Sequence, residues 1–281
     1  MHVMLNRLHT SRAVFFGILF ASTTSGYADT HLIYTETSNT PPRQTQIHIH
    51  QGKVRMQEAD SHTYILYDHS KSALYNVNLK SKQYITTTPQ TLHERVQQTS
   101  TLQRETQAAL AQQRQMMPDA QREAVEAQSK TAASTTTSIT LVPTDQQDTV
   151  AKLPCTIVQL KVDTQVQRDI CQAKADAIPQ DDLQTLVAMF SFLDKIAALS
   201  ATAQGKQPPA EGTAMLHKAG LALRIKATSA DGYHSELTEW DTTTQLDAEQ
   251  FTLPADFRNF EPSIKDAPPK QPIIINPNAR K

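Results

Sequence analysis

The sequence predicts an α+β protein in which an antiparallel β-sheet packs against helices. Between residues 31 and 88, short apolar runs alternate with polar residues at a period of two, the spacing of half-buried strands. Short connections rich in Asp, Ser and Lys separate these runs, as in an antiparallel meander. A strongly apolar helix is predicted over residues 179–200, after a second group of strands. Together these patterns indicate one α+β domain over residues 29–260.

Residues 1–28 are expected to be a cleaved signal peptide. Two arginines among the first twelve residues precede an apolar run, Ala13 to Ala21, that is too short to cross a bilayer. Small residues stand three and one positions before Asp29, the spacing of a cleavage site. An uncleaved membrane anchor is the alternative, and the short run argues against it. We therefore expect a protein exported to the periplasm, with no transmembrane segment after cleavage.

Charge and composition narrow the kinds of partner. Loss of residues 1–28 would leave 25 basic and 28 acidic side chains, a net charge of about −3. This balance provides no basic field for nucleic acid or anionic membranes, so no nucleic-acid partner is expected. The chain also lacks a nucleophile elbow, a His-Glu-x-x-His motif and a glycine-rich phosphate loop. The sequence therefore argues against an enzyme and predicts no cofactor.

The strands of the first group predict one apolar face. In the stretch YILYDHSKSALYNVNLKSKQYI (64–85), Tyr64 and Leu66 share a face of one strand, and Tyr75 and Val77 share a face of the next. This face is either an ordinary core or, in part, the lining of a ligand cavity. His48 and His50 also share a strand face, where a solvated surface is favoured over a metal site because no further ligands accompany them.

A polar segment interrupts the strands at Pro89. Residues 89–130 contain ten glutamines and only a sparse apolar stripe, which predicts a helical arm that restarts at Pro118. A polar linker completes this insert, residues 89–138. The arm is expected to be a solvated face or a surface for a protein partner. The proline-rich residues 261–281 are expected to form a disordered tail.

The only two cysteines, Cys155 and Cys171, are expected to form a disulfide in an oxidising compartment. A reactive or metal-binding thiol pair is the alternative, which their spacing disfavours. The helix that follows begins at Pro179 and carries acidic residues in its first turn. Its two apolar stripes, one of which includes Phe190 and Leu193, are wider than a one-sided surface helix needs. It is expected to be a core helix or a lid.

The ordered set of features resembles a family. GKVRM, the 64–85 stretch, MMPDAQREAVEAQ, the cysteine pair, DDLQTLVAMFSFL and FTLPADF occur in the order found in an uncharacterised family of exported bacterial proteins. That family, a domain of unknown function, has a lipoprotein-carrier-like (LolA-like) fold. The resemblance implies a strongly curved antiparallel half-barrel whose apolar concave face is covered by helices and holds acyl chains. The lid-locking arginine of the carrier has no counterpart here, and the glutamine-rich insert is foreign to it.

These observations lead to two functional hypotheses. The first is a non-enzymatic binding or chaperone-like protein for an apolar, acyl-bearing ligand such as a lipid or lipoprotein. The second is a structural or interaction protein of the cell envelope that uses the helical arm to bind a partner. For the first, the expected cavity residues are Tyr64, Leu66, Tyr75, Val77, Phe190 and Leu193.

Overall fold

The computed structural model describes residues 29–38, 41–115, 138–203, 213–228 and 232–261. The expected signal peptide lies outside the described residues. The same holds for the second piece of the helical arm with most of its linker, and for the tail beyond Glu261.

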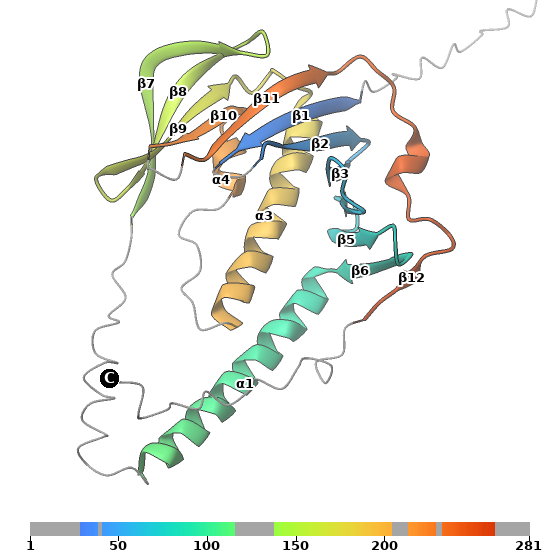
Figure 1. Cartoon of the computed structure of the whole chain (residues 1–281), viewed down its shortest axis with the longest axis vertical. Helices are drawn as coiled ribbons and strands as arrows, with labels where there is room; N and C mark the ends of the chain where they lie inside the picture. The colour runs from blue at the N-terminus through green and yellow to red at the C-terminus, as the bar shows by residue number, and fades with distance from the viewer. Residues whose placement is uncertain (1–28, 39–40, 116–137, 204–212, 229–231, 262–281) are drawn as a thin grey trace, which may run out of the picture.

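Twelve strands form a single open sheet in the described part of the chain (Figure 1). Its order is β12-β6-β5-β4-β3-β2-β1-β11-β10-β9-β8-β7, and every neighbouring pair is antiparallel except β12 with β6. The bounds are β1 (Thr30–Thr37), β2 (Arg43–His50), β3 (Lys53–Glu58), β4 (Thr63–Asp68), β5 (Ala73–Asn78), β6 (Gln83–Thr87), β7 (Ile139–Val150), β8 (Leu153–Val162), β9 (Gln165–Ala173), β10 (Ala222–Ala227), β11 (His234–Asp241) and β12 (Arg258–Asn259).

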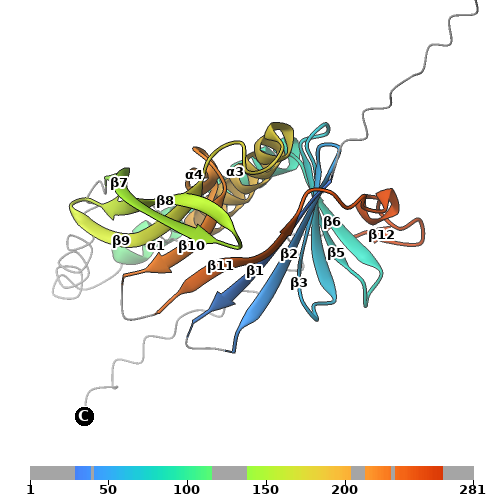
Figure 2. The ribbon, with the colours of Figure 1, turned by 90° about the horizontal axis from the view of Figure 1, so that it is seen from above.

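Helices cover one side of this twisted sheet. They are α1 (Pro89–Gln115), α3 (Gln180–Ala203) and α4 (Thr213–His217). Figure 2 shows all three on the same side, while the short 3₁₀ helix η1 (Ala248–Phe251) and β12 lie beyond the strands at the other end. The predicted α+β class, an antiparallel sheet with helices packed on it, is confirmed.

The core lies between the sheet and α3. Side chains of both halves of the sheet, among them Leu32 of β1 and Leu223 of β10, join Leu186 and Met189 of α3 in one buried cluster, and these four are fully buried. The helix carries buried apolar residues on more than one stripe because the bent sheet touches it on one side and α1 and α4 touch it elsewhere. The sheet and this helix therefore depend on each other for burial.

One helix of the described residues is long and apolar enough to cross a membrane, by length and composition only, so the expected absence of a later transmembrane segment stays a prediction. Residues 180–202 of α3 have a window of mean hydropathy 1.4, enough for a span, although Asp194 and Lys195 interrupt the run. In the structure this helix packs on the sheet, and a core helix passes the same test.

The helical arm begins where β6 ends. The Thr88 hydroxyl accepts a hydrogen bond from the Thr91 amide (3.2 Å), and the Thr91 hydroxyl lies 2.8 Å from the Thr88 amide. This reciprocal cap satisfies free groups of the first turn, and Pro89 suits the first helical position. The first piece of the predicted arm is thus one helix of 27 residues. Its outer half extends away from the sheet (Figure 1).

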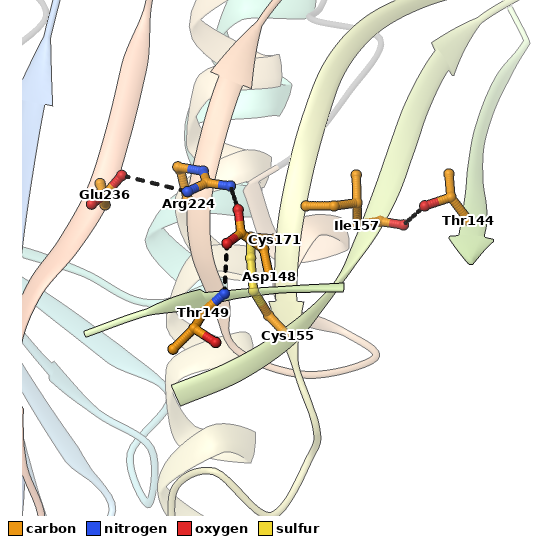
Figure 3. Close-up of a disulfide and its surroundings, with 8 residues drawn as sticks. All are labelled: Thr144, Asp148, Thr149, Cys155, Ile157, Cys171, Arg224 and Glu236. Atoms are coloured by element: carbon orange, nitrogen blue, oxygen red, sulfur yellow. Dashed lines mark hydrogen bonds and ion pairs between the residues drawn. A yellow bond between two sulfur atoms is a disulfide. The ribbon is translucent and has the colours of Figure 1, made fainter. Parts of the chain in front are cut away.

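The predicted disulfide is present. Cys155 of β8 and Cys171 of β9 are joined across neighbouring strands, with their Cα atoms 5.4 Å apart and both side chains buried. Figure 3 shows an ion-pair network beside it, in which Arg224 of β10 contacts Asp148 of β7 and Glu236 of β11. Covalent and ionic contacts therefore hold together the strands at this end of the sheet.

One edge of the sheet is irregular. The pairing of β7 with β8 shifts register between Pro143 and Gln147, so β7 contains a bulge. Pro143 also has no amide hydrogen to donate to a neighbouring strand. The outermost strand at this end is thus interrupted in the middle of its length.

Candidate functional site: an apolar groove between two helices

An open groove runs between α1 and α3 above strand β4. Its volume is about 670 Å³, within the range of small-molecule sites. Most of its lining is apolar, and the apolar residues are Tyr67, Leu92, Val96, Ala188, Phe192, Ala198 and Leu199.

Helical periodicity builds the two walls. Leu92 and Val96 are four residues apart and so lie on one face of α1. On α3, Ala188, Phe192 and Leu199 lie on one face at spacings of four and seven. Small alanines between the larger side chains leave the space that the groove occupies.

Strand β4 supplies the floor. Tyr67 is almost fully buried, and its ring centroid lies 6.2 Å from that of Phe192. Burial raises the pKa of the Tyr67 phenol, and the negative charge of Asp68 raises it further. The phenol therefore stays neutral, so the floor presents a ring without charge.

The rim is polar. His93 of α1 and Lys195 of α3 both line the groove and are exposed. Ser72 and Ser191 add hydroxyl groups. The lysine gives the rim a cationic side chain beside an apolar trough. This arrangement suits a molecule with an apolar chain and an anionic head.

The structure does not gather the six predicted cavity residues into one site. Tyr64, Leu66 and Val77 are buried in a separate cluster with Phe251 of η1, and Tyr75 packs against that cluster. Residues of β4 alternate between faces, so these side chains point away from the face that carries Tyr67. A period-two pattern shows which residues share a face but not which face the helices cover.

The two predicted helix residues lie on the helical side. Phe190 is buried in the main core and Leu193 packs against it, but neither lines the groove. The sequence analysis selected none of the residues that line the groove, among them the large apolar side chains of Tyr67, Leu92, Val96 and Phe192. The sequence contains a signal for three of these residues. Leu92 and Val96 belong to the sparse apolar stripe of the arm, and Phe192 belongs to the second apolar stripe of the helix predicted over residues 179–200.

A buried histidine supports this part of the core. His217 of α4 is 5% exposed, stacks on the Phe190 ring at 4.9 Å, and its Nδ1 accepts a hydrogen bond from the Ala222 amide (3.3 Å). Burial lowers the pKa of His217 to about 4. The folded protein therefore keeps this imidazole neutral at pH values where an unfolded chain would protonate it.

We expect the protein to become less stable as the pH is lowered from 6.5 to 4, because of His217. Below pH 6.5 the unfolded chain binds a proton that the folded protein does not, so acid favours unfolding until the folded group titrates near pH 4. Over this pH range the free energy of unfolding should fall by about 3 kcal/mol, because a shift of one pKa unit corresponds to ~1.4 kcal/mol. Urea unfolding at several pH values measures it. In His217→Asn, which retains an acceptor for the Ala222 amide, the slope should be smaller by about one proton; an unchanged slope would contradict the assignment.

A buried acidic cluster joins the start of the domain to α3. The Asp29 carboxylate lies 2.6 Å from Nδ1 of His50 and accepts a hydrogen bond from the Leu246 amide (2.6 Å). The Thr30 hydroxyl donates to the Asp182 carboxylate (2.5 Å). Burial raises the pKa of Asp182, and the nearby negative charge of Asp29 raises it further. Asp29, the residue expected to follow signal cleavage, is thus part of the packed interior.

The two histidines of the His-x-His pattern have separate surroundings. His50 pairs with Asp29, and its ring stacks on that of Phe251 with the centroids 5.1 Å apart. The rings of His48 and His31 meet edge to face, with their centroids 4.5 Å apart. Burial first, and the neighbouring His31 second, lower the pKa of His48 to about 4. Among the described residues, no group of three or more His, Cys, Asp or Glu side chains could hold a metal ion.

Comparisons with known proteins identify no family. No family model matches the chain, and no curated protein matches it. Solved structures with a similar path of the backbone include an uncharacterized conserved protein from Thermus thermophilus. It has a TM-score of 0.40 and 6% identity over 83% of this chain and 90% of its own. MucB has a TM-score of 0.35 and 9% identity over 82% of this chain and 58% of its own. PNGF-II has a TM-score of 0.35 and 10% identity over 79% of this chain and 29% of its own. A second MucB structure is the complex of Pseudomonas aeruginosa MucA and MucB. The chain thus spans less than two thirds of the MucB and PNGF-II chains.

Proposed function

We propose that the protein is a periplasmic, non-enzymatic carrier or chaperone that binds the acyl chain of a lipid or lipoprotein in the groove between α1 and α3. The observation that carries this proposal is the combination of an open apolar trough of about 670 Å³ with an exposed lysine at its rim. Each buried methylene of an acyl chain contributes roughly 0.8 kcal/mol. A chain of about ten methylenes would therefore outweigh a substantial cost of association.

The position of the groove also supports a binding role. It lies between α3, which packs on the sheet, and α1, which contacts α3 through few residues. A site with one fixed wall and one loosely packed wall can widen to admit a chain and close over it.

We expect Ala198→Trp to weaken the binding of a dansyl-labelled undecanoic acid at least tenfold. Ala198 lines the groove, so an indole at this position would occupy space that the acyl chain needs. Fluorescence titration measures the affinity. Ala197→Trp is the matched control, because Ala197 is exposed on the same helix and does not line the groove. Equal affinities in the two variants, or no binding by the unmodified protein, would overturn the proposal.

A second candidate function, binding of an envelope protein by the arm, is favoured by one observation. Leu102 and Leu110 in the outer half of α1 are 51% and 46% exposed. Their replacement by glutamate should prevent capture of a protein partner and leave acyl binding intact, whereas Ala198→Trp should have the opposite effect. The two variants therefore separate the two functions.

A further inference from the structure

The last described residues lead towards the groove. Strand β12 pairs with β6 in parallel, with Arg258 opposite Gln83 and Asn259 opposite Tyr84. The Phe260 amide donates to the Tyr84 carbonyl at 2.7 Å. Because the two strands run in the same direction, the chain at Glu261 is heading towards the end of β6, where α1 begins (Figure 1).

The groove begins close to this point. The Thr86 hydroxyl lies 3.4 Å from the Asn259 side chain. Pro89, which lines the groove, is three residues after Thr86 and hence at most ~11 Å from it along the chain. Glu261, two residues after Asn259, therefore lies near the end of β6 that leads to the groove.

Those residues contain one aliphatic run. Ile273, Ile274 and Ile275 follow one another between Pro272 and Pro277, in a segment otherwise rich in proline and polar residues. Ile273 is twelve residues after Glu261, and such a length can reach up to ~40 Å. This reach is larger than the ~11 Å that can separate Thr86 from Pro89 at the groove.

We propose that residues 273–275 of the same chain occupy the groove when no ligand is bound. Three adjacent isoleucines carry more apolar surface than an isolated side chain, and the groove is an apolar surface of suitable size within their reach. The tether also keeps them at a high effective concentration near the groove. The segment then regulates the site, because an incoming acyl chain must displace it; this competition rests on the proposed function, whereas the docking itself does not.

Cysteine trapping tests the docking in the full chain. In Ser191→Cys/Ile274→Cys, the first cysteine lies at the groove. The control is Lys80→Cys/Ile274→Cys, because Lys80 is exposed and lies outside the groove. Position 80 is also within reach of the tether, since the carbonyl of nearby Lys82 accepts a hydrogen bond from the Arg258 amide. Under mild glutathione oxidation, which preserves the Cys155–Cys171 bond, we expect the engineered disulfide to form at least tenfold faster in the groove pair. Equal rates in the two pairs would overturn the docking.

Ligand competition is measured separately, with Ile273→Ser, Ile274→Ser and Ile275→Ser combined in the full chain. The dansyl-labelled undecanoic acid should bind this variant about tenfold more tightly than the unmodified protein, because no intramolecular competitor remains. Fast trapping without probe binding by either protein would support the docking and overturn the acyl function. Probe binding of equal affinity together with equal trapping rates would support the acyl function and overturn the docking.

Discussion

Gly220→Ala is expected to destabilise the protein by about 3 to 5 kcal/mol, a large effect for one methyl group. Gly220 joins α4 to β10, and a Cβ atom there would lie 2.1 Å from the carbonyl oxygen of Ala173. That oxygen belongs to the backbone of β9, whose Ala173 amide donates to the Leu221 carbonyl at 2.9 Å. Relief of the clash must therefore separate two segments that are hydrogen-bonded within the core.

Urea unfolding monitored by circular dichroism measures this loss. Gly52→Ala is the control, because a Cβ at Gly52 meets nothing within 4 Å while its φ of +73° still disfavours alanine. The control should cost only about 1 kcal/mol. A Gly220→Ala variant as stable as the control would show that the close approach to Ala173 carries little energy.

Removal of the disulfide is the second large effect. Cys155→Ala/Cys171→Ala is expected to lose about 3 kcal/mol, because the bond closes a loop of sequence separation 16 in the unfolded chain. Both cysteines are buried in the main cluster, so the alanines add a small loss of packing. Differential unfolding with and without reductant measures the effect.

The reductant arm provides an internal check. Reduced unmodified protein should unfold at a midpoint slightly above that of the double variant, because it keeps the packing of both cysteine side chains, and reductant should not affect the double variant itself. If reductant leaves the unmodified protein unchanged while it demonstrably cleaves the bond, the disulfide does not stabilise the fold.

Local patterns in the sequence predicted the elements well. The alternation of 64–85 marks strands β4 to β6, and the apolar run after Pro179 marks α3 within a few residues. The cysteine pairing followed from there being two cysteines in a chain expected to be exported. Each of these inferences depends on residues that are neighbours in the chain or on chemistry that leaves no other partner.

The site could not be predicted in the same way. Both faces of β4 are apolar, since Tyr64 and Leu66 pack with Phe251 while Tyr67 faces Phe192. The pattern of β4 does not say which face packs on the helices and which packs on the segment around Phe251, more than 180 residues later in the chain. The groove likewise requires the angle between α1 and α3, which depends on tertiary packing and not on the periodicity of either helix.

Among the described residues, the edge strands β12 and β7 each pair on one side only, and their form bears on how the protein avoids self-assembly. An unpaired strand edge can recruit another copy and seed a fibre. At one end β12 is only two residues long, and at the other the bulge and Pro143 interrupt β7, which also carries the acidic side chains Asp145 and Asp148. Neither border offers a long, straight template. The protein can therefore leave its sheet unclosed, with room for helices on one side, without inviting polymer growth at its margins.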